Sequence, residues 1–242
     1  KLCRLIVHSE KLELGTQHAA LAVLPGARLE SIRRHGKLLG FCFGRLALSS
    51  HLRMTGNLAF APPRSGLRAE LVFDSRTLYF SDPRGFGTMA VLASADFGAD
   101  LGPDLLDPAL AELWPSLRQK GARRGAKAAL LDQKLVAGVG NYLADESLWR
   151  ARIHPEAKLA DIDPEHWQAL FEELLELVEG ALRAGGMTIR DYRRPDGSEG
   201  TMQSALLCYG RGGQPCLRCG RLLIKARVAG RGTVFCPSCQ PA

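Results

Sequence analysis

A glycine turn separates two apolar helical segments in the stretch Lys127-Ala-Ala-Leu-Leu-Asp132-Gln-Lys134-Leu-Val-Ala-Gly138-Val-Gly140-Asn141-Tyr-Leu-Ala-Asp145-Glu146-Ser-Leu-Trp149. A helix that starts directly after such a turn presents exposed backbone N–H groups and the positive end of its dipole. With the amide of Asn141 as a further donor, this helix start is suited to bind an anion such as phosphate. Glycine turns also join helices that bind nothing, so the turn alone leaves both interpretations open.

Basic residues surround this turn. They are Arg118, Lys120, Arg123, Arg124, Lys127 and Lys134, with Asp132 as the single acid among them. A basic element beside an anion-binding turn suits the phosphate backbone of a duplex. The pattern therefore predicts a DNA-binding element that resembles a helix-turn-helix.

The C-terminal cysteines form the most specific motif of the chain. Cys216, Cys219, Cys236 and Cys239 make two C-x2-C pairs with sixteen residues between them. Each pair can wrap one knuckle around a tetrahedral metal, so we expect one structural zinc ion as the cofactor. Two disulfides or free core thiols are the alternative, but a secreted disulfide scaffold of this size usually carries more pairs. The hairpin strands of this zinc ribbon are expected at residues 222–225 and 233–236.

The charge of the ribbon supports a nucleic-acid partner. Residues 211–242 contain six Lys and Arg residues and no Asp or Glu. Four thiolates and one zinc ion add about −2, so the folded module keeps about +4, a field that attracts phosphate. The whole chain is basic as well, with 32 Lys and Arg against 25 Asp and Glu in 242 residues.

Composition and length exclude several classes of protein. With 46% hydrophobic and 24% charged residues the chain is globular rather than disordered or fibrous. No apolar run approaches the roughly 20 residues that span a bilayer, so a membrane protein is excluded. The N-terminus lacks the apolar core and cleavage pattern of a secretory signal, and the cysteines suit a reducing compartment. We therefore expect a cytoplasmic protein of the bacterial cytosol or nucleoid type.

Three segments are expected along the chain. Residues 1–95 predict a β-sandwich or flattened barrel, because short apolar strands at 21–24, 38–43, 45–48, 67–73 and 77–80 are divided by turn residues. Residues 96–207 predict a helical domain. One helix is expected to begin at Asp107-Pro108 and to end at Pro115, and another to run from Asp163-Pro164 to Gly185-Gly186 with Leu182 in its core face. A flexible loop (185–200) and the ribbon (208–242) follow, which gives an α+β multidomain fold.

At this point a family becomes recognisable. The stretch from Gly138 to Trp149, followed by Ile153-His154-Pro155, resembles the helix-two-turns-helix signature of the formamidopyrimidine-DNA glycosylase and endonuclease VIII family. The ribbon, with Tyr209-Gly210-Arg211 and Gly230-Arg231-Gly232-Thr233, is similar to the C-terminal zinc finger of that family. Segments 33–37, 51–56 and 82–87 resemble its β-domain lysine motif and its two loops that enter the duplex. The resemblance covers nearly the whole chain and implies a β-sandwich, a helix-two-turns-helix domain and a zinc finger, with DNA in the cleft between them.

The resemblance also implies an activity. Members of the family are base-excision-repair enzymes, bifunctional DNA glycosylases and AP lyases, which flip an oxidised base out of duplex DNA and remove it through a Schiff base before cutting the strand. The expected partner is duplex DNA with oxidised bases or abasic sites, and a monomer is expected. Transferred to this sequence, the catalytic candidates are Lys37 and Glu146. The DNA-contacting candidates are His51, Met54, Arg84, Phe86, Lys127, Asn141, Tyr209, Lys225 and Arg231. Core positions for His51 and Tyr209, and ordinary packing for Met54 and Phe86, are the alternatives.

Two features depart from the family pattern. The family's nucleophile is the α-amine of an N-terminal Pro that a Glu follows, whereas this sequence begins Lys1-Leu2. We therefore expect that it starts inside a longer gene product and that it binds DNA without performing the chemistry; a non-catalytic DNA-binding protein of the same fold is the alternative. Met54, Arg84 and Phe86 look like the formamidopyrimidine branch. Residues 102–108 and Asn141-Tyr-Leu look more like the endonuclease VIII branch, which is slightly favoured.

Overall fold

The structure is a computed structural model that describes residues 1–8, 12, 22–188 and 193–242. It divides into two compact units, Lys1–Ala99 with Gly185–Thr201 and Asp100–Ala184 with Met202–Ala242. The zinc ribbon therefore belongs to the same unit as the helices. Residues Gly185–Thr201, which were expected in the helical segment, belong to the unit that contains the sheets. The structure thus has two units where the sequence predicted three segments. None of the helices in the described ranges is both long and apolar enough to cross a membrane.

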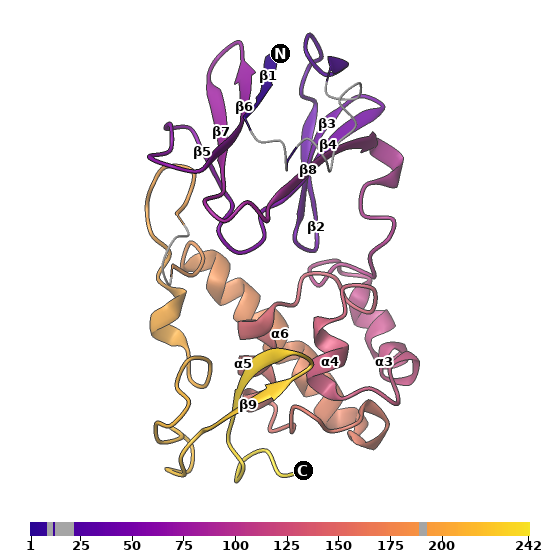
Figure 1. Ribbon diagram of the computed structural model, residues 1–242. Helices are drawn as coiled ribbons and strands as arrows, with labels where there is room; N and C mark the ends of the chain where they lie inside the picture. Colours follow the sequence, from indigo (N-terminus) through magenta and orange to yellow (C-terminus); the bar gives the residue numbers. More distant parts are fainter. Residues whose placement is uncertain (9–11, 13–21, 189–192) are drawn as a thin grey trace. The chain divides into compact units, whose positions relative to one another are not determined.

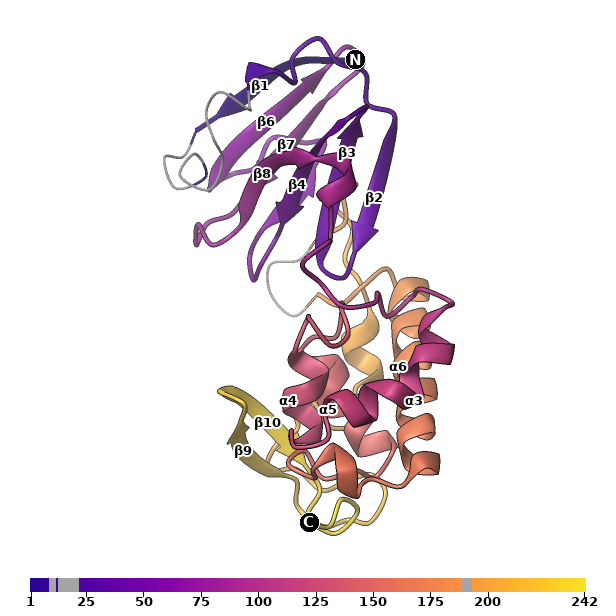
Figure 2. The same ribbon diagram turned by 90° about the vertical axis from the view of Figure 1, so that its right-hand side faces the viewer.

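The first unit is a β-sandwich, as expected. One antiparallel sheet has the order β1 (Leu2–Val7), β6 (Leu67–Phe73), β7 (Thr77–Ser81) and β5 (Asn57–Ala59). The other has the order β2 (Ser31–His35), β3 (Leu38–Phe43), β4 (Leu46–His51) and β8 (Thr88–Ala93) (Figures 1 and 2). Phe41 and Leu48 of one sheet share a buried cluster with Leu71 and Phe80 of the other. Apolar side chains on facing sheets thus form a single core.

The strand predictions were right in part. Strands β4 and β7 overlap their predicted ranges, whereas β1, β5 and β8 were not predicted, although β1 and β8 are largely apolar. Strands β3 and β6 coincide with the predicted ranges, whereas the strand predicted at 21–24 was wrong. Leu21 lies outside the described residues, and Val23 and Leu24 lie in a turn. Leu24 is nevertheless fully buried, so its apolar character reflects packing rather than a strand. Strand β2 was not predicted because it is an exposed edge strand without an apolar alternation.

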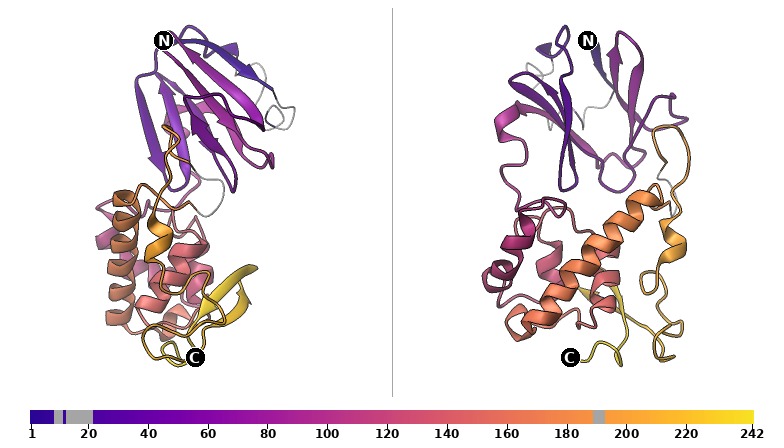
Figure 3. Two further views of the ribbon diagram at one scale, coloured as in Figure 1. Left: turned by 90° about the vertical axis from the view of Figure 1, so that its left-hand side faces the viewer. Right: turned by 180° about the vertical axis from the view of Figure 1, so that it is seen from behind.

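Helices and a hairpin make up the second unit (Figure 3). The helices are α3 (Leu110–Lys120), α4 (Ala126–Leu131), α5 (Asn141–Arg150) and α6 (Pro164–Arg183). The ribbon hairpin consists of β9 (Ile224–Val228) and β10 (Arg231–Phe235), close to the predicted strands. Short 3-10 turns of this unit lie at Leu159–Asp161 and Met202–Ala205, and another lies in the first unit at Ser94–Asp96. Helix α6 begins as predicted, but Leu182 is 67% exposed, so its assignment to the core was wrong.

The predicted end of a helix at Pro115 was also wrong, because α3 continues through this residue to Lys120. A proline inside a helix removes one backbone hydrogen bond and costs about 3 kcal/mol. Tertiary contacts offset this cost: the rings of Trp114 and Trp167 stack with centroids 4.4 Å apart. Each indole N–H also donates to the backbone carbonyl of the other tryptophan, at 2.8 and 2.9 Å. These contacts hold the helix across the proline.

Residues 185–200 were expected to be a flexible loop. In the described part of this segment, the backbone N–H of Gly200 donates to the hydroxyl of Thr188 at 3.0 Å. A turn follows in which the N–H of Arg194 donates to the carbonyl of Ser198 at 2.9 Å. Residues 189–192 of this predicted loop lie outside the described residues.

Candidate nucleic-acid interface and zinc centre

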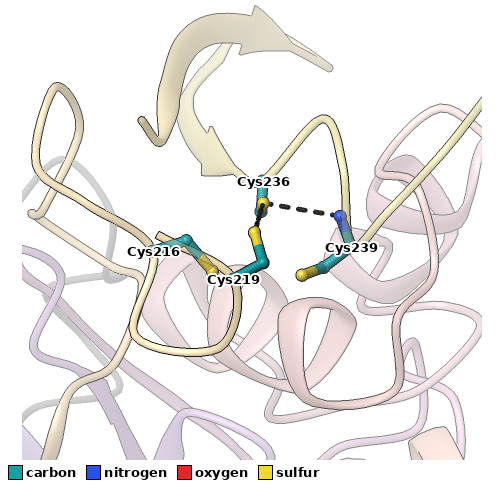
Figure 4. A group of neighbouring side chains, drawn as sticks. All are labelled: Cys216, Cys219, Cys236 and Cys239. Carbon is teal, nitrogen blue, oxygen red and sulfur yellow. Dashed lines mark hydrogen bonds between the residues drawn. The ribbon is translucent and has the colours of Figure 1, made fainter. Parts of the chain in front are cut away.

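The four ribbon cysteines form a metal site. Figure 4 shows their side chains turned toward one another, and the four sulfur atoms all lie within 4.8 Å of one another. Tetrahedral zinc with Zn–S bonds of about 2.3 Å separates its sulfurs by about 3.8 Å. The distance of 3.5 Å between the sulfurs of Cys219 and Cys236 fits this geometry. The site holds one structural zinc ion, as the spacing of the cysteines predicted.

Backbone groups prepare the first knuckle for metal. Burial raises the pKa of the Cys216 thiol, but hydrogen bonds from the backbone of Arg218 and Cys219 outweigh it and lower the pKa to about 6. This thiol is therefore largely a thiolate at neutral pH, which is the form that zinc binds.

Two side chains without a predicted structural role fix the ribbon to helix α5 and to the residues that follow it. The side chain of Gln240 accepts from the N–H of Cys236 and donates to the carbonyl of Ile153, both at 2.8 Å. Arg218 donates to the carbonyl of Trp149 at 2.9 Å, and its guanidinium lies 4.2 Å from the centre of the Trp149 ring. Hydrogen bonds around a structural metal site orient the knuckles. One indication of these contacts was present in the sequence, because Arg218 lies between the zinc ligands Cys216 and Cys219.

The glycine turn and the ribbon hairpin come together at the start of α5. Asn141 is the first residue of this helix, and its side-chain amide donates to the carbonyl of Gly232 at 3.0 Å. The hairpin turns at Ala229-Gly230, where both residues have positive φ values of 51° and 72°, and this turn leaves Arg231 exposed at the start of β10. Ninety residues apart in sequence, the two segments thus bring the N-terminus of α5 and the Asn141 amide against the backbone next to Arg231, whose side chain is exposed. We call Asn141, Arg231 and the α5 N-terminus the anion surface.

Lys127 does not belong to this surface, which corrects its prediction as a DNA contact. Its side chain is fully buried, and its ammonium donates to the carboxylate of Asp145 at 2.6 Å. It also donates to the Gly232 carbonyl at 3.0 Å and to the Thr233 hydroxyl at 2.7 Å. The other oxygen of Asp145 accepts from the N–H of Val234 at 3.0 Å. Lys127 therefore supports the hairpin from inside, because a buried ammonium requires a counter-charge and acceptors.

Glu146, predicted as a catalytic residue, has a structural role in this unit. The residue is fully buried. Its carboxylate accepts from the backbone N–H groups of Leu207, Cys208 and Tyr209 at 2.6 to 3.1 Å. This set of bonds fixes the segment that leads into the first zinc knuckle. Tyr209 is half-buried, with its ring edge-on to that of Tyr142 at 6.3 Å between centroids.

The predicted basic run is only partly available for DNA. Arg118 donates to the carbonyl of Ile162, and Arg124 pairs with Asp132. Lys127 is buried, as described above, while Lys120, Arg123 and Lys134 are exposed. Lys225 is exposed on β9, and its aliphatic stem lies over Gly212. Three of the six basic residues of the predicted run are thus engaged in contacts within the protein.

In the first unit, Lys37 and His51 lie next to each other. Lys37 is exposed in the turn between β2 and β3, and its neighbour Leu38 pairs with His51 in β4. Burial is the largest cause that lowers the pKa of His51, the charges of Arg53 and Lys37 act in the same direction, and the pKa falls to about 4. The imidazole is therefore neutral at neutral pH. Its Nδ1 accepts from the N–H of Arg53 at 2.9 Å, which places the ring proton on Nε2 as a donor.

Met54, Arg84 and Phe86 are exposed on two neighbouring loops of the sheet unit. Met54 is 70% exposed and Phe86 is 53% exposed, so the alternative that they are ordinary packing residues was wrong. The Arg84 guanidinium lies 4.8 Å from the centre of the Phe86 ring. Singly exposed apolar side chains are common, whereas apolar side chains that gather on neighbouring loops can mark a binding site.

Asp82 and Asp145 had no predicted role. Both are fully buried acids: Asp82 hydrogen-bonds to the loop that carries Phe86, and Asp145 to strand β10, which carries Arg231. Asp82 begins the segment 82–87, and an Asp before Pro is a turn signal that was available. Asp145 gave no signal, because an acid inside a helix usually lies at the surface.

Comparisons with known proteins agree with this arrangement. Family models match for the formamidopyrimidine-DNA glycosylase N-terminal domain over residues 2–89 and its H2TH domain over residues 101–193. The zinc finger found in FPG and IleRS matches over residues 213–242. The formamidopyrimidine-DNA glycosylase of Thermus thermophilus is 40% identical over 98% of this chain and 90% of its own length. That of Geobacillus kaustophilus is 40% identical over 92% of this chain and 85% of its own.

Solved structures show the same relationship. The crystal structure of the MutM (Fpg) protein from Thermus thermophilus superposes with a TM-score of 0.88 at 38% identity, covering 99% of this chain and 91% of the other. The Lactococcus lactis Fpg in complex with abasic-site DNA has a TM-score of 0.86 at 33% identity, covering 100% and 93%. These relatives carry the formamidopyrimidine name, which corrects the slight preference for the endonuclease VIII branch. Because both the family models and relatives above 30% identity match across nearly its whole length, this chain belongs to the formamidopyrimidine-DNA glycosylase family.

Proposed function

We propose that this protein is a bifunctional DNA glycosylase and AP lyase of base-excision repair that acts on formamidopyrimidine and related oxidised bases in duplex DNA. The exposed pair Met54 and Phe86 carries this proposal. A base must leave the stack before its glycosidic bond can be attacked, and unstacking costs a few kcal/mol. Apolar side chains that fill the vacated space recover part of that cost. The Lactococcus lactis Fpg structures with Fapy-dG and abasic-site DNA support this assignment.

The chemistry requires an amine nucleophile, as the family resemblance implies. The amine forms a bond to the sugar C1′ while the bond from C1′ to the base breaks, and the departing base takes up a proton. After the attached amine has lost a proton, its nitrogen lone pair forms the C1′=N bond while the bond from C1′ to the ring oxygen O4′ breaks and O4′ takes up a proton. The Schiff base formed in this way acts as an electron sink, so a base can remove a 2′ proton while the bond to the 3′ phosphate breaks. The adjacent Lys37 ammonium and neutral His51 imidazole supply phosphate contacts on the sheet unit, where Lys37 stabilises charge near the scissile phosphate.

The anion surface of the second unit supplies further backbone contacts. Asn141 uses one amide proton for Gly232 and keeps the second for a phosphate. Arg231 offers a planar fork of donors, and the start of α5 adds backbone N–H groups. Lys225 and Tyr209 extend these contacts along the strand. None of these groups reads a base edge, so they position DNA of any sequence.

We further propose that the protein works as a monomer in the cytoplasm. Its zinc site consists of four thiols, which stay reduced in a cytosolic compartment. The anion surface and the exposed loops belong to a single copy of the chain, so a second copy need not supply these contacts.

DNA binding is tested first. The chain should bind a duplex with a tetrahydrofuran abasic analogue at least tenfold more tightly than the same duplex without damage, as measured by fluorescence anisotropy. Met54→Ala and Phe86→Ala should each reduce this preference for the lesion more than they reduce binding to undamaged DNA. Equal affinity for both duplexes would contradict the proposal.

The covalent step is tested by borohydride trapping on an abasic duplex. The assay uses the chain as printed and the same chain placed after a family N-terminal segment that begins with Pro-Glu. We expect a trapped adduct and incision of Fapy-dG DNA with the second form. If that form binds lesion DNA tightly but gives no adduct, the protein is instead the non-catalytic DNA-binding protein that the sequence left as the alternative.

A further inference from the structure

Asp82 lies buried beneath the two exposed loops of the sheet unit. We define the Met54 loop as residues 52–56, between β4 and β5, and the Phe86 loop as residues 83–87, between β7 and β8. Asp82 directly precedes the Phe86 loop and has no exposed surface. It therefore cannot itself contact DNA, although it lies directly next to residues that we place in the DNA interface.

The carboxylate of Asp82 is bonded to both loops at once. One oxygen accepts from the hydroxyl of Thr55 in the Met54 loop and from the N–H of Arg84 at 3.2 Å. The other oxygen accepts from the N–H of Gly87 at 2.6 Å. Burial raises the pKa of Asp82, but the Thr55 hydroxyl and backbone N–H groups of the Phe86 loop outweigh it and lower the pKa below its ordinary value. The group is thus an ionised acceptor, and hydrogen bonds to ionised groups are the stronger ones.

The backbone of Asp82 is itself firmly held. Its N–H donates to the carbonyl of Gly66 at 2.7 Å, and its carbonyl accepts from the side chain of Arg68 at 2.8 Å. The carboxylate therefore cannot follow one loop without disturbing the other.

The backbones of both loops are closely constrained. In the Met54 loop, Arg53 has a φ of 56°, an unfavourable value for a residue with a side chain, whereas in the Phe86 loop Gly85 has a φ of 69°, which glycine adopts without strain. Gly87 is packed so closely that an added Cβ would lie 2.6 Å from the ring of Phe80. Residues in strained conformations persist only where surrounding contacts determine them. The carboxylate of Asp82 supplies contacts of this kind to both loops.

We propose that Asp82 is a positioning residue that couples the Met54 loop to the Phe86 loop, so that Met54 and Phe86 enter damaged DNA as one unit. This inference rests on the proposed function, because it concerns how the same two side chains act. Coupling of the two loops would make binding selective for damaged sites. A site in the duplex that admits only one of the two side chains would obtain little binding free energy from either. An Asp82 that merely stabilised the sandwich would change the melting temperature and leave Met54 and Phe86 independent of each other.

A double-mutant cycle tests the coupling. Met54→Ala, Phe86→Ala and their combination are compared for affinity toward a tetrahydrofuran duplex, with 2-aminopurine beside the lesion to report insertion by fluorescence. If the two side chains acted independently, the fold-loss of affinity in the double variant would equal the product of the fold-losses in the two single variants. If they act together, we expect the loss in the double variant to be about fivefold smaller than that product, which corresponds to an interaction free energy of about 1 kcal/mol.

The cycle is then repeated in two backgrounds that differ by one hydroxyl group. Thr55→Val removes the donor to Asp82 at nearly constant shape, whereas Thr55→Ser keeps it. We expect the fivefold coupling to disappear in Thr55→Val and to persist in Thr55→Ser, with melting temperatures showing that both proteins are folded. Asp82→Asn should abolish the coupling and also the 2-aminopurine response; if it fails to fold, the Thr55 pair still carries the test.

The possible failures are distinguishable. If the unmodified chain gives no preference for the lesion and no 2-aminopurine response, the proposed function is wrong and this inference falls with it. If that chain responds to the lesion but Met54 and Phe86 contribute independently, or if Thr55→Val keeps the coupling, only the role of Asp82 is overturned.

Discussion

The β-sandwich and the zinc ribbon hold exposed functional residues in place by different physical means. In the sandwich, apolar side chains from two sheets form the core, and a single buried carboxylate supports the loops above it. Beneath the ribbon, the buried cluster contains Trp149, Leu223 and three cysteines, so metal replaces much of the missing apolar contact. Small modules bury too little apolar surface to fold without such aids. The difference predicts which disturbances damage one region and spare the other.

Zinc removal should have the largest effect, and it should be confined to the second unit. Metal binding contributes of the order of 10 kcal/mol to folding in small zinc modules. Cys236→Ser or chelation should therefore unfold β9 and β10 and lower DNA affinity at least 100-fold. Hydrogen exchange should show lost protection in the hairpin while strands β3 and β4 stay protected. Equal loss of protection in both regions would show that the two do not differ in this way.

Breaking the buried pair under the hairpin should have the next largest effect. Lys127→Met leaves the Asp145 carboxylate buried without its ammonium, which costs about 3–5 kcal/mol. Urea unfolding measures this loss. The double variant Lys127→Met/Asp145→Leu should recover part of the stability, because it leaves no lone buried charge. If Lys127→Met costs less than 1 kcal/mol, the hairpin does not depend on this pair.

Removing one exposed cation should affect DNA affinity without affecting the fold. Arg231→Gln should weaken binding about tenfold at low salt and reduce the slope of log affinity against log salt by about 0.9, since one phosphate contact is lost. Arg183→Gln is the matched control, because Arg183 is an exposed cation that pairs with Glu179 on α6. Anisotropy titrations at several salt concentrations measure both variants. Equal slopes for Arg231→Gln and the unmodified chain would remove Arg231 from the interface.

The smallest expected effect is the pH dependence of His51 in the sandwich. Unfolded histidine binds its proton near pH 6.5, whereas folded His51 binds it only near pH 4. Its contribution to stability is therefore complete above pH 6.5 and is lost as the pH falls toward 4. An NMR titration should give a midpoint near 4, and Lys37→Gln should raise it because a neighbouring positive charge is gone. A midpoint near 6.5 would contradict the neutral donor assigned to this ring.

The sequence anticipated features that depend on local spacing. The two C-x2-C pairs predicted the zinc site, and apolar runs predicted β3, β6 and most of α6. Local chemistry suffices here, because a knuckle or an amphipathic helix is defined by residues close together in the chain. The family motifs also marked Met54 and Phe86, whose exposure the structure then established.

Burial and long-range pairing were decided only by the tertiary structure. The sequence predicted a DNA contact for Lys127 and a catalytic role for Glu146. In the structure both side chains are buried: Lys127 pairs with Asp145 beneath the hairpin, and Glu146 accepts a hydrogen bond from the backbone of Cys208. The sequence predicted that a helix ends at Pro115. In the structure α3 continues through this proline, and Trp114 of the same helix stacks on Trp167. The sequence around a charged residue or a proline is the same whether the residue faces water or packs against a distant segment, so local sequence does not distinguish the two cases. The composition and motifs thus determined the zinc, the family and the exposed candidates, whereas packing between distant segments decided which charges are available to DNA and which support the fold.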